Sequence, residues 1–171
     1  LDGPEVEVDY LLERVGEVME RSGSSSLRVS QSEAERNQFW AGRKSAFPAV
    51  GRISPDYLCM DGTIPRRRLP DMMVRMASLS QKYGLRVANV FHAGDGNLHP
   101  LILFDASIDG ELEQAELLGG DILTLCVDVG GTITGEHGVG LEKMPQMPYQ
   151  FGDAELAQFR RLKAAFDSEE L

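Results

Sequence analysis

The 171-residue sequence has only two cysteines and no apolar run near the ~20 residues that a membrane-spanning helix requires. Cys59 and Cys126 lie far apart and form no Cys-x-x-Cys pair, so we expect two free buried thiols rather than a disulfide. Free thiols are typical of a reducing compartment, which indicates the cytoplasm. The absence of a long apolar run predicts a chain without a membrane span.

Basic residues are in the minority. The sequence holds 17 Lys and Arg against 27 Asp and Glu, a formal net charge of −10 at pH 7. Such a surface repels a polyanion, so we expect no nucleic-acid partner. The one basic cluster is Arg66-Arg67-Arg68. It precedes a predicted helix and is interpreted as a solvated loop, with contact to an anion as the alternative.

The apolar content of 42% and charged content of 26% are those of a globular domain. Apolar periodicity, caps and turn residues predict helices at residues 4–22, 32–48, 70–84, 110–129 and 153–166. Short strands are predicted at residues 27–30, 57–60, 85–92 and 98–104. Helices and short strands alternate around a central hairpin, which indicates an α+β fold with a mainly antiparallel sheet flanked by helices.

The second predicted helix carries a candidate binding residue. Ser32 and Glu35 form a capping-box pattern at its start, and Pro48 is expected to end it. One side of the helix presents residues spaced by three or four: Arg36, Trp40, Arg43 and Phe47. Arg43 has the fork geometry to bind a carboxylate through two nitrogens. The sequence by itself favours the alternative, a surface arginine paired with one of the many acids.

All three histidines lie in two glycine-rich turns. His92 and His99 bracket a Gly-Asp-Gly-Asn turn, and His137 follows Glu136 in the segment Gly-Glu-His-Gly-Val-Gly. If the hairpin strands place the first two histidines opposite each other, their Cβ atoms lie ~5 Å apart, close enough to share one ion. Two histidines and one carboxylate form a three-ligand set that leaves coordination positions open.

Two readings of the histidines stay open from spacing alone. Glycine permits close approach of a ligand, which favours a divalent-metal or catalytic site. A single histidine is nevertheless more often a hydrogen-bonded structural residue. The glycine stretch at residues 130–140 lacks both G-x-G-x-x-G and Gly-Lys-Ser/Thr, and Glu136 would repel a phosphate, so nucleotide binding by this loop is not expected.

Several motifs together resemble the C-terminal (cap) domain of FAD-linked oxidases. They are Trp40-Ala41-Gly42-Arg43-Lys44, Ile53-Ser54-Pro55-Asp56-Tyr57, Met60-Asp61-Gly62-Thr63-Ile64-Pro65-Arg66, the segment from Val90 to Pro100 and Gly135-Glu136-His137-Gly138-Val139-Gly140. The resemblance is closest to the branch of glycolate oxidase catalytic subunits and D-lactate dehydrogenases. It implies one ferredoxin-like substrate-binding domain over residues 1–171, from which an N-terminal FAD-binding domain is absent. We therefore expect an excised piece that is inactive in isolation.

The resemblance also implies roles for individual residues. His92, His99 and Glu136 would bind a divalent metal, zinc or manganese. Arg43 would hold the substrate carboxylate and His137 would act as general base, while a 2-hydroxy acid passes a hydride to FAD. The equivalents of distal-carboxylate ligands are the apolar Phe47, Cys59 and Leu101, which favours glycolate or D-lactate without choosing between them.

Partners follow from the same resemblance. It implies a second flavin subunit and an iron–sulfur subunit, which leaves association with the inner face of the membrane open. Exposed apolar surface would permit a homo-oligomer. Two alternatives differ in class: a metal-dependent hydrolase that uses the same ligands to activate water, and a non-catalytic α+β module with structural histidines.

Overall fold

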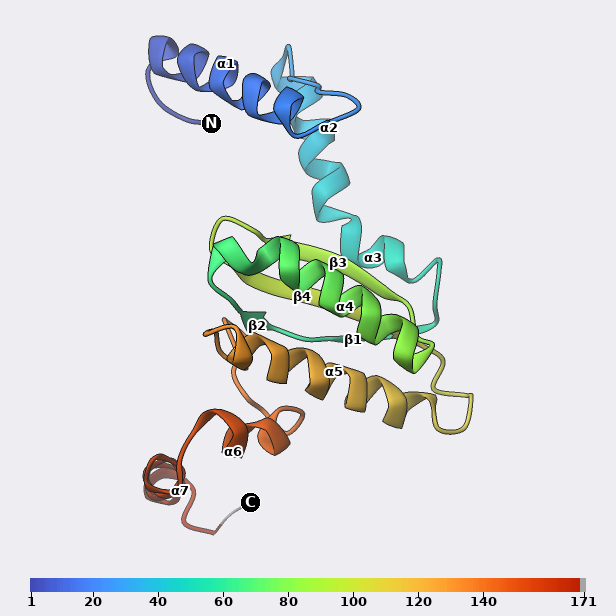
Figure 1. Cartoon of the computed structure of the whole chain (residues 1–171), viewed down its shortest axis with the longest axis vertical. Helices are drawn as coiled ribbons and strands as arrows, with labels where there is room; N and C mark the ends of the chain where they lie inside the picture. Colours follow the sequence, from blue (N-terminus) through green and yellow to red (C-terminus); the bar gives the residue numbers. More distant parts are fainter. Residues whose placement is uncertain (170–171) are drawn as a thin grey trace. The chain divides into compact units, whose positions relative to one another are not determined.

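The computed structural model describes residues 1–169, and Figure 1 shows the course of the chain. The chain divides into two compact units, Leu1–Lys44 and the part from Ser45 onward. The first unit holds α1 (Glu5–Arg21) and α2 (Glu33–Lys44). The predicted helix at residues 4–22 is confirmed. The predicted strand at residues 27–30 is wrong, because this helical unit offers no neighbouring strand with which it could pair.

The second predicted helix is shorter than expected. Its cap forms in part: Ser32 Oγ accepts the backbone N–H of Glu35 at 3.2 Å, while the Glu35 carboxylate accepts the N–H of Gln31 at 2.8 Å. The helix ends at Lys44, and α3 (Ala46–Val50) begins after one intervening residue, Ser45. The prediction of one helix that Pro48 ends is wrong. Pro48 lies in the first turn of α3, where its missing N–H leaves no helical bond unmade.

The second unit is built around a four-stranded antiparallel sheet. Its centre is β4 (Asn97–Phe104), which pairs along one edge with β3 (Val87–His92). On the other edge of β4, β1 (Asp56–Cys59) and β2 (Gly62–Thr63) follow one another. Every pairing is antiparallel, so the predicted α+β class and both hairpin strands are confirmed.

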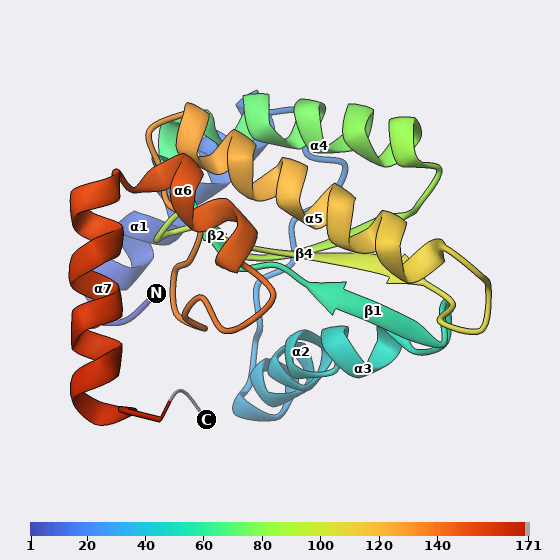
Figure 2. The ribbon, with the colours of Figure 1, turned by 90° about the horizontal axis from the view of Figure 1, so that it is seen from below.

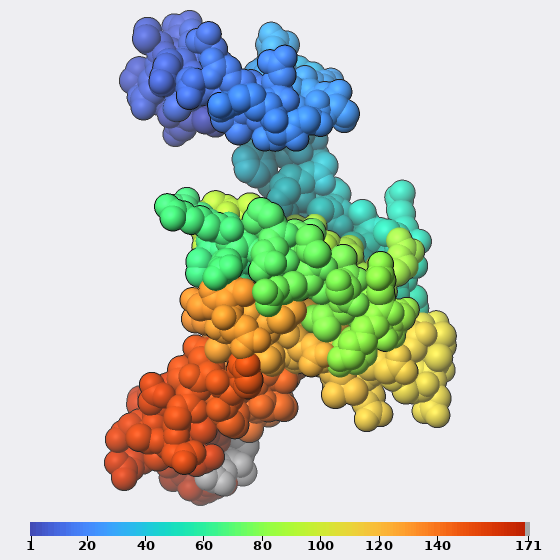
Figure 3. Space-filling view, viewed as in Figure 1, coloured from blue at the N-terminus to red at the C-terminus, as the bar shows by residue number. Residues whose placement is uncertain are grey.

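Strand β4 is buried on both faces along its whole length. Two helices, α4 (Leu69–Tyr83) and α5 (Glu111–Asp128), cover one face, as Figure 2 shows. Their side chains meet along both helices (Figure 3). Leu98 and Ile102 point into this core, which also includes Met72, Met76, Leu118 and Ile122. Leu101 and Leu103 point to the other face, where Val50 of α3 covers them.

The remaining elements complete the second unit. They are the 3-10 turns at Arg66–Arg68 and Met144–Gln146, α6 (Met147–Gln150) and α7 (Asp153–Phe166). The three arginines are exposed and lead into α4, as the solvated-loop interpretation predicts. Cys59 and Cys126 are both free, as expected, but only Cys126 is buried, whereas Cys59 is partly exposed. Among residues 1–169, no helix has the length and apolar character that crossing a bilayer requires.

Candidate functional site

The hairpin of β3 and β4 brings two histidines together, but in a register that differs from the expected one. His92 pairs with Asn97, and His99 pairs with Val90. The condition that the histidines lie directly opposite each other is not met, because the ladder continues to His92 and closes around the four residues 93–96. Val90 and His92 share one face of β3, so the two histidines are diagonal neighbours. Their ring centroids are 5.2 Å apart.

Glu136 lies at the point where the three imidazoles converge. Its Oε1 is 2.8 Å from Nε2 of His99 and 3.8 Å from Nε2 of both other histidines, His92 and His137. The ring of His137 stacks on that of His99 at 5.0 Å with an interplanar angle of 16°. Four of the five residues singled out in the sequence therefore meet within one small volume.

The four residues differ in exposure. The side chain of His99 is only 3% exposed, whereas those of His92, Glu136 and His137 are close to half exposed. The Phe47 ring meets the His99 ring edge-on at 6.3 Å. Nδ1 of His99 is buried without a hydrogen-bond partner. The centre thus has one fixed imidazole at its base and three groups that solvent or a ligand reaches.

Asp61 anchors the loop that carries Glu136 and His137. It is fully buried in the short connection between β1 and β2. Its carboxylate accepts the backbone N–H groups of three consecutive residues: Gly135 at 3.1 Å, Glu136 at 3.0 Å and His137 at 2.7 Å. Thr134 Oγ1 donates a further bond at 3.0 Å, and Lys143 Nζ lies 3.4 Å away.

The charge state of Asp61 follows from these contacts. Burial by itself would raise the pKa of the Asp61 carboxyl. The three backbone donors and the Lys143 ammonium outweigh burial and hold its pKa well below the usual range. Asp61 also lies within coordination reach of His99, Glu136 and His137. Because one oxygen, Oδ2, already faces all five donors, we assign Asp61 a structural role rather than that of a ligand.

Gly135 explains part of the glycine-rich segment. A Cβ atom at this position would come within 2.6 Å of both Asn97 Oδ1 and Thr63 Oγ1, so a larger residue would fit only if these side chains moved. Gly138 has φ +79°, a conformation that favours glycine. The Gly-Glu-His-Gly motif is therefore shaped by packing on one side and by backbone conformation on the other.

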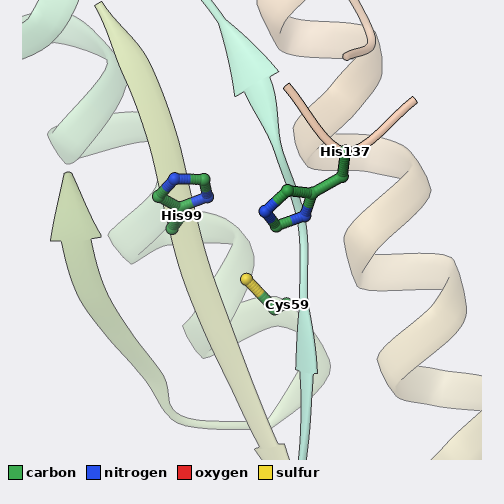
Figure 4. A group of neighbouring side chains, drawn as sticks. All are labelled: Cys59, His99 and His137. Carbon is green, nitrogen blue, oxygen red and sulfur yellow. The ribbon is translucent and has the colours of Figure 1, made fainter. Parts of the chain in front are cut away.

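Cys59 approaches the same cluster from β1. It pairs with Leu101, so it shares the sheet face of His99. Its sulfur and the ligand atoms of His99 and His137 lie within 4.8 Å of one another, and Figure 4 shows the three side chains. Burial raises the pKa of the Cys59 thiol to about 11, and the carboxylates of Asp61, Glu142 and Glu136 act in the same direction.

Two residues near the centre were not among the sequence candidates for these roles. Asp61 occurs in a quoted motif, but no spacing rule links it to a loop 76 positions away. The sequence indicates Cys59 only as an apolar residue that favours a small substrate. The fifth candidate, Arg43, is exposed in the last turn of α2, within the first unit. Its part in the site stays a prediction.

Comparison with known proteins gave consistent matches. The family model described as FAD linked oxidases, C-terminal domain, matches residues 1–171. Glycolate oxidase subunit GlcD of Escherichia coli (strain K12) is 61% identical over 171 residues, which cover 100% of this chain and 34% of that protein. The Bacillus subtilis (strain 168) protein of the same name is 33% identical over 166 residues, 97% of this chain and 35% of that protein.

A relative with a different name extends the comparison. The mitochondrial D-lactate dehydrogenase [cytochrome] of Arabidopsis thaliana is 30% identical over 152 residues, 88% of this chain and 27% of that protein. The chain thus spans about a third of the length of the curated relatives that it matches.

Proposed function

The chain belongs to the FAD linked oxidases, whose C-terminal domain it matches throughout, and from this premise we propose that it is the substrate-side domain of a flavin-dependent 2-hydroxy-acid dehydrogenase. The proposed substrates are glycolate and D-lactate, because relatives carry the names glycolate oxidase subunit and D-lactate dehydrogenase. FAD supplies the hydride acceptor, a chemistry that side chains do not offer. In the whole protein, the rest of the chain would hold most of this cofactor.

The observation that carries the proposal is the convergence of three imidazoles on the Glu136 carboxylate. His92, His99 and Glu136 supply two nitrogens and one carboxylate, a donor set that suits zinc or manganese and leaves positions open for a substrate. His99 fits a ligand role because its ring is held in place by the sheet and by Phe47. When bound, the metal acts as a Lewis acid that lowers the pKa of the substrate hydroxyl.

His137 is the proposed general base. Its Nε2 lies 3.8 Å from Glu136 Oε1, too far for a hydrogen bond, so this nitrogen is available to take the proton of the substrate hydroxyl. The side chain is half exposed, which gives a substrate access to it. The hydrogen bond from the backbone N–H of His137 to Asp61 fixes the backbone position from which the imidazole side chain extends.

We assign substrate recognition to Arg43 and to a cluster of three apolar side chains. The Arg43 guanidinium would grip the substrate carboxylate through two nitrogens. Phe47, Cys59 and Leu101 belong to one hydrophobic cluster on the His99 face of the sheet. A second carboxylate placed against these groups would lose its hydration without a partner. This cluster supports a small monocarboxylate as substrate.

The proposed setting is a multisubunit oxidase. Two relatives are named as subunits of glycolate oxidase, which supports the existence of partner subunits. We propose that these are a second flavin subunit and an iron–sulfur subunit. We propose that the complex is cytoplasmic, because free thiols persist in that compartment. We also propose that those partner subunits can attach it to the inner face of the membrane. Self-association through exposed apolar side chains belongs to the same proposal.

Stopped-flow measurement of flavin reduction in the intact flavoprotein tests the function. Glycolate and D-lactate should bleach the flavin, and a chelator should abolish the bleaching until metal is restored. A dicarboxylate such as D-2-hydroxyglutarate should react far more slowly. Chelator-sensitive ester hydrolysis without any flavin reduction would instead favour the metal-dependent hydrolase.

A further inference from the structure

Three potential ligands form a set that differs from the one proposed for the catalytic metal. They are the Cys59 thiol and the imidazoles of His99 and His137, whose ligand atoms lie within 4.8 Å of one another. We propose that this set is a second, alternative site for a thiophilic divalent cation such as Zn²⁺ or Cd²⁺. The site itself does not depend on the proposed function, because it is argued from the geometry of these side chains and their neighbours and not from any reaction.

The buried imidazole of His99 supplies the strongest indication of a missing ligand. Its Nε2 is engaged by Glu136 at 2.8 Å, which leaves Nδ1 for another partner. Nδ1 is buried and has no hydrogen-bond partner, an arrangement that costs free energy unless something binds there. In Figure 4, one ring nitrogen of His99 faces His137, and the Cys59 sulfur points toward the space between the two rings.

A cation reaches this set by its own route. Cys59 and His137 line a hollow of about 370 Å³ that continues along residues 138–143. His92 and Glu136 line a different hollow, and the two share no residue. Glu142 also borders the first hollow and adds a carboxylate. The one ammonium there, on Lys143, already faces Asp61 at 3.4 Å, so its charge is compensated.

The donor atoms determine which cation binds. One sulfur and two imidazole nitrogens favour zinc and cadmium, whereas carboxylate and water favour manganese. Zinc holds sulfur at about 2.3 Å and nitrogen at about 2.0 Å, so neighbouring donors end up roughly 3.5 Å apart. The ligand atoms now lie within 4.8 Å of one another, so they must move closer together to coordinate zinc. This requires the ring of His137, which stacks on that of His99, to turn, and its half-exposed position permits the movement. On coordination, the Cys59 thiol releases its proton to solvent.

The two ligand sets exclude each other because they share His99. A neutral imidazole has one lone-pair nitrogen, and the other nitrogen carries the proton. A cation on Nδ1 therefore puts the proton on Nε2, where it bonds to Glu136 and blocks coordination there. This exclusion, unlike the site itself, rests on the proposed function for the role of the first set.

Cadmium titration of the metal-free protein tests the site, because a cadmium–thiolate bond has its own ultraviolet charge-transfer band. The wild-type protein should develop this band and saturate at one equivalent. Cys126 provides a matched control, since it is the other free thiol and lies in the core. Cys126→Ala should retain the band, and Cys59→Ala should lose it.

Further variants separate binding from folding. Cys59→Ser keeps the size of the side chain and should lose the band while its circular dichroism stays that of the wild type. His137→Ala should weaken cadmium binding at least about 10-fold. A band that persists without Cys59, that never appears in the wild type, or that is indifferent to His137 overturns the proposal. Neither flavin nor substrate is present, so the result is independent of the proposed activity.

Discussion

The carboxylate of Asp61 accepts the backbone N–H of His137 at 2.7 Å, although 76 residues separate the two in the sequence. The same carboxylate holds the backbone of Gly135 and Glu136. One buried side chain at the edge of the sheet therefore holds the backbone of both candidate site residues on the loop, Glu136 and His137. Lys143, itself 3% exposed, balances the charge that this arrangement buries.

Asp61→Asn should destabilise the protein by about 3 kcal/mol, because it leaves the buried Lys143 ammonium without its counter-ion and weakens several charged hydrogen bonds. Urea denaturation measures this change. Asp121→Asn is the matched control: Asp121 pairs with Lys82 at 3.0 Å on the surface, and its loss should cost less than about 1 kcal/mol. Equal effects of the two substitutions would contradict the anchoring role.

The contribution of Asp61 should also depend on pH. Hydrogen bonds and Lys143 hold its folded-state pKa below the ordinary value of 3.8 against the opposing effect of burial. A carboxyl whose pKa is lower in the folded state stabilises the protein above the unfolded-state pKa and loses this effect as the pH falls toward the folded one. The difference in unfolding free energy between wild type and Asp61→Asn should be constant near neutral pH and shrink below pH 3.8. A difference that grows on acidification would reverse the assigned sign.

Gly135→Ala should cost about 1 to 3 kcal/mol, because the added methyl would overlap Asn97 Oδ1 and Thr63 Oγ1. Thermal unfolding measures the loss. Gly94→Ala is the control in the nearby turn, since a Cβ there meets nothing within 4 Å, and it should stay within about 0.5 kcal/mol of the wild type. If both variants unfold at the wild-type temperature, the packing explanation for this glycine fails.

Arg43→Ala should lower kcat/KM of the intact flavoprotein at least about 30-fold, since a lost carboxylate partner is worth about 2 kcal/mol or more. Steady-state kinetics with glycolate and D-lactate measure the effect. Arg36→Ala on the same helix should change little, because Arg36 pairs with Glu33 on the surface at 3.6 Å. Unchanged kinetics in Arg43→Ala would remove this residue from the substrate site.

His137→Ala should slow flavin reduction by about 10² to 10⁴ while manganese content stays at the wild-type level, as expected for a lost general base. His99→Ala, by contrast, should both slow flavin reduction and lose the manganese, because its Nε2 is the buried nitrogen closest to Glu136. Metal analysis beside stopped-flow kinetics separates the two roles. Equal loss of manganese in both variants would make His137 a ligand instead.

Sequence reasoning reached much of the fold because local signals are strong in the second unit. Apolar periodicity followed by Gly84 predicted the end of α4, and Gly84 does adopt φ +70° at the C-cap. The glycine-rich turn after His92 predicted the hairpin, which closes at the pair His92 and Asn97. The motifs that indicated FAD-linked oxidases are confirmed by the match over residues 1–171. Where local signals compete, prediction failed: Pro48 indicated a helix end, yet it is equally suited to a first turn.

The site was less accessible to the sequence. The confinement of His92, His99 and His137 to glycine-rich turns indicated a centre, but the hairpin register depends on backbone pairing that spacing does not encode. Asp61 and Cys59 reach the centre only because β1 and β2 run along the edge of β4. Such long-range neighbours have no signature in a single sequence.

Burial of β4 on both faces links stability to chemistry. Leu98 on one side is part of the main core under α4 and α5, while the adjacent His99 on the other side forms the base of the histidine cluster. A strand clamped in this way has no solvent-facing side that could absorb a displacement. Enlarging or shrinking a core residue beneath Leu98 would thus also shift the His99 imidazole, so mutations that stabilise this core should also change the affinity of the proposed metal site.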